Sequence, residues 1–476
     1  MRGSLYTFET YKRILDLEER RGRLKKNTFS EELKQQSAEL KELRKKLKNA
    51  SKTEKAGLAE SLGNKKSEYE EKRIEEIREI TEHIQDNDFK IKLREVNAKG
   101  KPGYTTDNVE SLLLSKVLML EIKRSYKYTP ANRNNIIEEL RALLDNPMQK
   151  IVIRADIHGF FESIPQDKLI GKILEDAYLS AFGLKCLKTF LYRFNELSGN
   201  LETKVGIPRG LSFSSYLSEI YMASFDRKIR QIEGVYFYKR YVDDIIIIAN
   251  PSVQDKETYW KRLEQEVNNI GLTLSEDNKK RSCQEFPSLQ EKTVRLNYLG
   301  YQFRYQNGKL DVLMTEDKYN RLLDCIRLSF EKYKEIGNYT SRRKNPKVKR
   351  EDATIQFMHR LNALTFNGHL NGRKNYVLVG IYYSNKYLTN LEQLEQLDEY
   401  LKNCFSDSAM FCPTETMFNY GQDNDYQKNV AVIKKKAIET CSFVKGFKNR
   451  CLYRWNDYTY ILKQLGNLYY SQEKDE

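Results

Sequence analysis

Two adjacent aspartates, Asp243 and Asp244, stand immediately before a run of four isoleucines. A short run of β-branched residues predicts a buried strand, and residues 234–238 on the other side of the aspartates are also strand-like. Together the two segments predict a β-hairpin with the acidic pair at its tip. Neighbouring carboxylates repel each other, and a hard divalent cation such as Mg²⁺ removes that cost. The tip is therefore a candidate metal site, although a solvated acidic turn has the same sequence pattern.

A second apolar strand, residues 150–156, ends in another aspartate, Asp156. Phosphoryl transfer at a two-metal site needs carboxylates from different strands that converge on ions about 3.5–4 Å apart. Asp156 would supply the third carboxylate of such a site.

At these stretches the chain resembles reverse transcriptases. The strand that ends in Asp156 and continues to Phe160 and Phe161 resembles their motif A, and Tyr241-Val242-Asp243-Asp244 resembles motif C. The segments that resemble motifs B, D and E are 206–221, 271–280 and 296–303, respectively.

The resemblance covers about residues 89–305 and implies an α+β right-hand polymerase. We expect a helical N-terminal arm at 1–88, with a break around 49–64, and fingers at 89–148. A palm with an antiparallel sheet should follow at 149–305, and a helical thumb-like region at 306–476. Residues 89–93 are expected to form a strand, and 97–103 a loop.

The resemblance also assigns roles to single residues. Asp156, Asp243, Asp244 and the Ile157 carbonyl would hold two Mg²⁺ ions, with Mn²⁺ as an alternative, and Lys279 would act as general acid, although Lys280 is adjacent. Contacts to the incoming nucleotide and the nascent base pair are expected from Lys127, Arg133, Ile157, Phe160, Phe161, Gly206, Pro208, Arg209, Gly210 and Tyr241. The primer grip would comprise Tyr298, Leu299 and Gly300.

Some of these assignments have ordinary alternatives. Lys127 and Arg133 suit a triphosphate, because lysine is a compact charge and arginine a bidentate fork, but they also fit a charged surface loop. Phe161 is expected to exclude a 2′-hydroxyl; the alternative is that Phe161 belongs to the core and Phe160 is the gate.

Motif B departs from the pattern of many reverse transcriptases, which have Gln before the second glycine and Ser-Pro after it. Arg209 and Ser214-Ser215 stand there instead. This variant resembles bacterial defence-associated and abortive-infection reverse transcriptases. The resemblance implies a role in antiphage defence, a cognate noncoding RNA, and a homo-oligomer or a partner protein. Two alternatives remain: a retron-like or group II intron-derived enzyme, and a polymerase-shaped RNA-binding scaffold.

Composition bears on partners and compartment. The net charge of +15 favours a polyanionic partner, as expected for an RNA template and a DNA product. Seven scattered cysteines without a Cys-x-x-Cys pair predict a reduced cytoplasmic protein. No apolar run reaches transmembrane length, so no membrane association is expected. The basic segment 341–350 is expected to follow phosphates as a loop.

Overall fold

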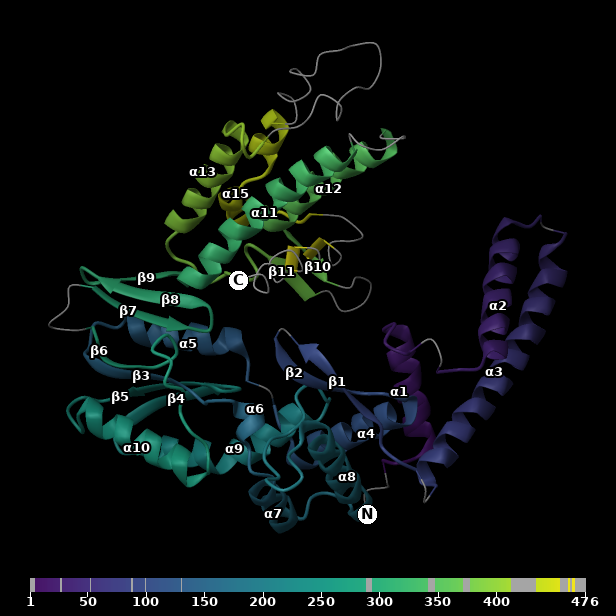
Figure 1. Ribbon diagram of the computed structural model, residues 1–476, viewed down its shortest axis with the longest axis horizontal. Helices are drawn as coiled ribbons and strands as arrows, with labels where there is room; N and C mark the ends of the chain where they lie inside the picture. Colours follow the sequence, from purple (N-terminus) through teal and green to yellow (C-terminus); the bar gives the residue numbers. More distant parts are fainter. Residues whose placement is uncertain are drawn as a thin grey trace. The chain divides into compact units, whose positions relative to one another are not determined.

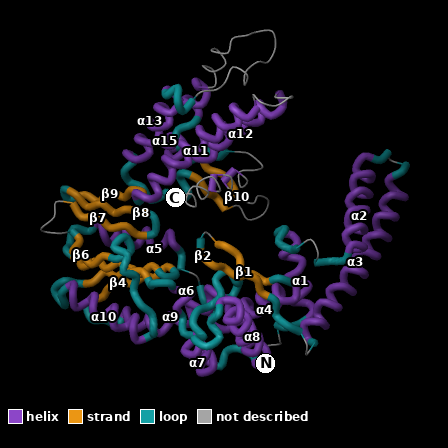
Figure 2. The backbone as a smooth tube through the Cα atoms, in the orientation of Figure 1, coloured by secondary structure: helices purple, strands orange, loops and turns teal. Residues whose placement is uncertain are grey.

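The computed structural model describes residues 5–25, 28–51, 53–86, 89–98, 100–129, 131–287, 293–340, 347–370, 377–411, 434–453, 461–462 and 465–466. The chain divides into two compact units. The first comprises Met1–Ala131 and Ile153–Cys283, and the second Asn132–Val152 and Gln284–Glu476. Helices and sheets occur in both, which confirms the α+β class (Figures 1 and 2).

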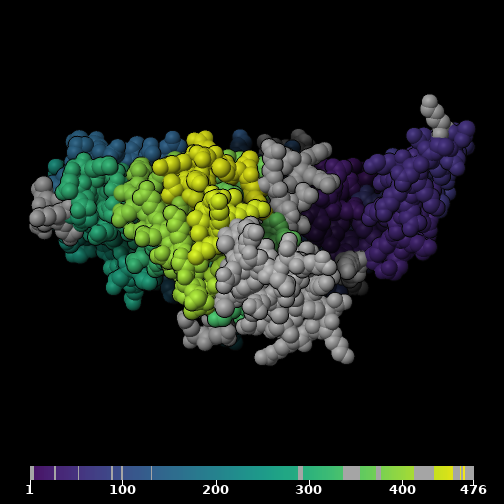
Figure 3. Space-filling model, turned by 90° about the horizontal axis from the view of Figure 1, so that it is seen from above, coloured from purple at the N-terminus to yellow at the C-terminus, as the bar shows by residue number. Residues whose placement is uncertain are grey.

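The first unit begins with three helices, α1 (Phe8–Arg20), α2 (Glu31–Asn49) and α3 (Lys55–Gln85). The side chains of Thr7 and Ser30 cap α1 and α2 by accepting backbone N–H groups. Helices α2 and α3 pack side by side, and much of the surface of this hairpin is open to solvent (Figure 3, purple). The break between them spans only residues 50–54, because Gly57 and Gly63 are accommodated inside α3.

A β-hairpin and a buried helix follow. Strands β1 (Leu93–Ala98) and β2 (Lys101–Thr106) pair antiparallel, with Ala98 opposite Lys101. The expected loop at 97–103 is therefore mostly strand, and the expected strand starts later than residue 89. Helix α4 (Val109–Tyr126) carries apolar residues around most of its circumference and is buried accordingly.

The central sheet has four strands in the order β4-β5-β3-β6. Their bounds are Val235–Tyr241 (β4), Asp244–Ala249 (β5), Lys150–Asp156 (β3) and Ser282–Phe286 (β6). Strands β3 and β5 are buried along nearly their whole length, as their continuous apolar sequences predict. The helices of this region are α6 (Phe160–Ser163), α7 (Gln166–Asp176), α8 (Ala181–Ser198), α9 (Ser214–Arg230) and α10 (Lys256–Asn269). Helix α9 packs against β4 and α10.

The second unit combines a three-stranded sheet with helices. Strands β7 (Thr293–Tyr298), β8 (Tyr301–Gln306) and β9 (Lys309–Met314) form a meander. The other elements are α5 (Arg133–Asp145), α11 (Glu316–Thr340), α12 (Lys347–Thr365), β10 (Asn367–Leu370), β11 (Val377–Gly380), α13 (Glu392–Ser406) and α15 (Phe443–Lys448). An aromatic cluster forms part of the core beside α11, α12 and α13: Phe330, Tyr333, Phe357, Phe405 and Phe411. Strands β9, β10 and β11 were not expected in a helical region.

Two further sequence expectations concern the basic segment 341–350 and membrane spans. Residues 341–346 of the basic segment lie outside the described residues, and residues 347–350 belong to α12 rather than to a loop. Across the described chain, every helix is too short or too polar to cross a membrane.

Candidate active site

The acidic pair lies at the tip of the β4–β5 hairpin. Tyr241 pairs with Asp244, which leaves Val242 and Asp243 as a two-residue turn. Val242 has φ +60°, a left-handed conformation that is rare for a β-branched residue. Strain of this kind costs on the order of 1–3 kcal/mol and persists only where surrounding contacts impose it.

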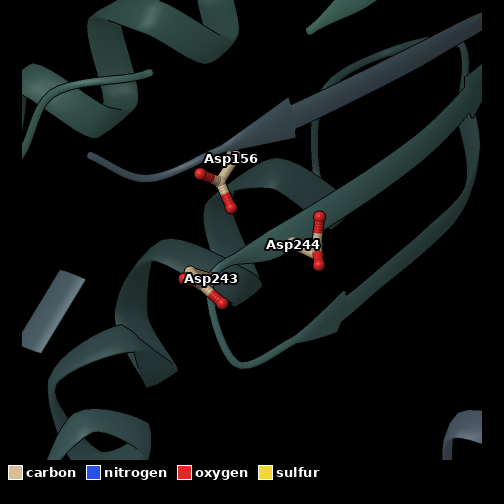
Figure 4. A group of neighbouring side chains, drawn as sticks. All are labelled: Asp156, Asp243 and Asp244. Atoms are coloured by element: carbon tan, nitrogen blue, oxygen red, sulfur yellow. The ribbon is translucent and has the colours of Figure 1, made fainter. Parts of the chain in front are cut away.

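Three carboxylates converge beside this turn. Asp156 ends β3, Asp243 lies in the turn and Asp244 begins β5, and Figure 4 shows their carboxylates gathered around one space. One carboxylate oxygen from each lies within 4.8 Å of the others. Asp156 is buried, whereas Asp243 and Asp244 are half-buried. The backbone joins these segments, because the Ile157 N–H donates to the Asp243 carbonyl at 3.3 Å.

The electrostatics of the group fit a divalent cation. Burial and the nearby charge of Asp156 raise the pKa of Asp243. Burial raises the pKa of Asp244 to about 6, helped by the other two carboxylates and opposed by Arg154. These shifts show that concentrating negative charge here is unfavourable without a counter-ion. Carboxylate oxygens are the ligands that Mg²⁺ prefers, so the three residues fit a metal site.

Two cations already flank the carboxylates. The Arg154 guanidinium lies 3.6 Å from Asp244 Oδ1 and donates to the Lys279 carbonyl at 2.7 Å. Lys280 Nζ lies 2.8 Å from Asp156 Oδ2. The lysine of the motif D segment that reaches the carboxylates is therefore Lys280. The sequence favours Lys279, but the Lys279 backbone N–H donates to Asp277 Oδ1 in a tight turn, and it is the following side chain, Lys280, that reaches Asp156.

Motif B brings two glycines against other backbones. A Cβ on Gly206, at φ +92°, would lie 3.0 Å from the Glu162 carbonyl oxygen. A Cβ on Gly210, at φ +102°, would lie 2.8 Å from the Tyr104 carbonyl oxygen. Between them, Pro208 is buried and its carbonyl accepts a hydrogen bond from the Ser214 hydroxyl. The glycines thus permit the close approach that the sequence indicates.

Arg209 links motif B to the start of α6. Its guanidinium forms an ion pair with Glu162 at 2.8 Å and lies 5.3 Å from the centroid of the Phe161 ring. Phe160 is 1% exposed, whereas Phe161 is half-buried. The two candidate rings therefore differ, and Phe161 is the one with surface to offer a ligand.

The remaining predicted residues lie in both units. In the first, Lys127 is exposed at the C-terminal cap of α4, and Tyr241 is half-buried at the end of β4. In the second, Leu299 and Gly300 form the β7–β8 turn, and Tyr298 is buried.

Arg133 is engaged with this β7–β8 turn. It donates from Nε to the Leu299 carbonyl at 3.1 Å, and its guanidinium lies 5.0 Å from the Tyr301 ring centroid. Its assignment to the triphosphate stays a prediction, as does the use of the Ile157 carbonyl as a metal ligand.

Sequence reasoning did not single out Arg154. A signal was present, because Arg154 is the one charged residue between the apolar Ile153 and Ala155 in a strand that ends in the candidate Asp156. A buried strand rarely tolerates such a side chain without a partner.

Comparison with known proteins gives the site its family context. Residues 108–303 match the family described as reverse transcriptase (RNA-dependent DNA polymerase). The comparison with curated proteins found no match.

Solved structures with some likeness include telomerases. One is telomerase from Candida albicans with the TWJ fragment of telomeric RNA, at 10% identity and a TM-score of 0.37, covering 81% of this chain and 65% of that chain. Another is apo telomerase from Candida tropicalis, at 12% identity and a TM-score of 0.34, covering 80% and 65%. This chain spans less than two thirds of the length of either. Similarity at this level does not indicate a shared function.

The family match contains all three aspartates and the segments that resemble motifs A to D. Residues 108–303 therefore form a reverse transcriptase domain, an RNA-directed DNA polymerase domain whose candidate catalytic aspartates are Asp156, Asp243 and Asp244.

Proposed function

We propose that the chain is an RNA-directed DNA polymerase that builds DNA from deoxynucleoside triphosphates. The observation that carries this proposal is the convergence of Asp156, Asp243 and Asp244 within a domain of the reverse transcriptase family. A scaffold without chemistry would gain nothing from keeping three carboxylates together, two of which, Asp243 and Asp244, have raised pKa values.

The roles of the side chains follow from their positions. Asp156, Asp243 and Asp244, with the Ile157 carbonyl, would hold two Mg²⁺ ions. When bound, these ions lower the charge on the reacting phosphate and orient the 3′-hydroxyl for in-line attack. Arg209 and Phe161 would contact the incoming nucleotide, and Gly206 and Gly210 would leave room beside the nascent base pair. Such catalysis depends on positioning and charge, so rigid contacts around the turn matter.

A finer assignment is a role in antiphage defence with a cognate noncoding RNA. It is supported by the motif B variant, with Arg209 before the second glycine and Ser214-Ser215 after it. The net charge of +15 supports a stable nucleic-acid partner. Assembly into a homo-oligomer, or with a partner protein, belongs to the same proposal.

The polymerase function is tested by primer extension on an RNA template with purified protein, Mg²⁺ and dNTPs. Asp243→Asn should lower incorporation by at least about 10³-fold, which corresponds to roughly 4 kcal/mol of transition-state stabilisation. Glu175→Gln is a matched control, because it removes an exposed carboxylate from α7 in the same unit. Equal activity of the two folded variants would reject the assignment.

The finer assignment needs separate measurements. Cells that express the wild type should survive phage challenge, and cells that express Asp243→Asn should not. Protection that survives this substitution would favour the RNA-binding scaffold. Nucleic acid that co-purifies at moderate salt should dissociate as salt is raised, and its sequence would identify the template.

A further inference from the structure

Arg240 lies on β4, two residues before the strained Val242. Its side chain is only 3% exposed. Two carboxylates from α9, Glu219 and Asp226, face it across the β4–α9 contact. Burying a guanidinium with two carboxylates has a large desolvation cost, which only a well-formed set of hydrogen bonds offsets.

All five N–H donors of this guanidinium have acceptors. Asp226 accepts from Nε at 2.9 Å and from Nη2 at 2.8 Å, and Glu219 accepts from Nη1 at 3.0 Å and from Nη2 at 2.6 Å. The fifth donor, on Nη1, points to the Val242 carbonyl at 2.7 Å. Arginine offers five donors in a rigid fork, whereas lysine offers three on a flexible stem. The site therefore uses the full capacity of an arginine.

The two carboxylates are themselves held in place. The Tyr238 hydroxyl donates to Asp226 Oδ1 at 2.6 Å. Burial and then the charge of the nearby Glu219 carboxylate raise the pKa of Tyr128 to about 12, and the Tyr128 hydroxyl hydrogen-bonds to that carboxylate. Fixed carboxylates fix the guanidinium, and the guanidinium in turn fixes the Val242 carbonyl.

We propose that Arg240 is a positioning residue for the acidic turn: it ties the Val242 carbonyl to α9 and so holds Asp243 and Asp244 facing Asp156. A valine at positive φ does not keep that conformation unaided. A backbone bond to the turn, from the Ile157 N–H to the Asp243 carbonyl, is longer at 3.3 Å. The inference rests on the proposed polymerase function only in treating the turn as catalytic.

The test compares Arg240→Lys with Glu219→Gln. The first keeps the charge but lacks the donors to satisfy both carboxylates and the Val242 carbonyl. The second weakens one of the two ion pairs, but Asp226 still accepts from Nε and Nη2, so Arg240 and its bond to the turn stay in place. A structural role alone predicts that both variants lose thermal stability and nothing else.

Two readouts need no nucleotide. Hydrogen exchange of the amides at residues 241–245 should quicken by about tenfold or more in Arg240→Lys and remain near wild type in Glu219→Gln. Mn²⁺ affinity, measured by electron paramagnetic resonance of the free ion, should weaken about tenfold in Arg240→Lys alone, as for other residues that orient metal ligands. An inactive wild type would refute the polymerase function and leave this comparison valid.

A third readout applies to the active enzyme. Arg240→Lys should lower kcat with little change in the KM for dNTP, because the turn positions the reacting groups. Unchanged exchange, Mn²⁺ affinity and kcat in a folded Arg240→Lys protein would overturn the proposal. If that variant does not fold, Arg240→Gln is placed in a Glu219→Gln, Asp226→Asn background, where no buried carboxylate is left unpaired. Wild-type exchange of the amides at residues 241–245 in that triple variant would overturn the proposal equally.

Discussion

Replacement of Phe161 by alanine should admit ribonucleotides. Phe161 follows Phe160 at the start of α6, and the two ring centroids lie 5.5 Å apart. Phe160 is 1% exposed and belongs to the core, whereas Phe161 is half-buried with the Arg209 guanidinium over its ring. A ring placed beside the sugar leaves a 2′-hydroxyl without space and without a hydrogen-bond partner.

The geometry sets the expected magnitudes. Truncating the buried Phe160 should cost about 3–5 kcal/mol of folding free energy. Phe161→Ala should cost only about 2 kcal/mol, because half-burial yields roughly half of the transfer free energy and the cation–π contact adds about 0.5–1 kcal/mol. A steric gate of about 1–3 kcal/mol corresponds to a change of roughly 10–200-fold in the preference for dNTP over rNTP. In Phe161→Ala the loss of this preference should therefore be comparable in free energy to the loss of stability, whereas Phe160→Ala should lose stability alone.

The assay is single-nucleotide incorporation, with kcat/KM measured for a dNTP and the matching rNTP, alongside the Tm of each variant. We expect Phe161→Ala to relax discrimination and keep much of its dNTP activity, and Phe160→Ala to lose stability with its discrimination unchanged. Unaltered discrimination in a folded Phe161→Ala protein would refute the reasoning. Relaxed discrimination in Phe160→Ala alone would move the gate to that residue.

Two further predictions concern stability. Gly210→Ala should cost about 2–4 kcal/mol of folding free energy, since the new Cβ would lie at positive φ and 2.8 Å from the Tyr104 carbonyl oxygen. The control is Gly57→Ala inside α3, where a Cβ meets no atom within 4 Å, and this change should be neutral or stabilising. Similar losses of Tm in both variants would contradict the packing argument. In the second unit, burial and then the charge of Arg133 lower the pKa of Lys318 to about 7. Because the unfolded amine keeps its proton up to its ordinary value of 10.5, the native state loses stability as pH falls toward 7. Lys318→Met should therefore be more stable than wild type near pH 7. This difference in folding free energy should shrink by up to about 1.4 kcal/mol per pH unit as the pH is raised to 9. A difference in Tm that stays constant across this range would exclude a neutral amine at Lys318.

Local signals predicted the strands that carry the aspartates. The runs at 150–156 and 244–249 are rich in β-branched residues, and a fully buried strand needs no more than that. The glycines of motif B likewise predicted a close backbone approach. Their partners, the backbones of Glu162 and Tyr104, depend on how distant segments meet and left no trace in the local sequence.

Other differences between the sequence expectations and the structure have different causes. The choice between Lys279 and Lys280 depends on one residue of turn geometry, which spacing alone does not determine. Strand β9 was overlooked although Asn307-Gly308 separates it from β8, and Asn-Gly is a strong hairpin signal.

Three neighbouring residues at the β4–β5 turn break local rules together. Asp243 and Asp244 place two like charges side by side, and both are partly buried. Val242, between the end of β4 and Asp243, adopts a positive φ that valine disfavours. None of these features stabilises the fold, and each would be relieved by a common substitution. The surrounding groups offset the cost in separate ways: Arg154 and Lys280 face the carboxylates, and Arg240 holds the turn through the Val242 carbonyl. A costly arrangement that is held from several sides is what a preorganised catalytic centre requires, because the positions of the carboxylates are then fixed before any substrate arrives.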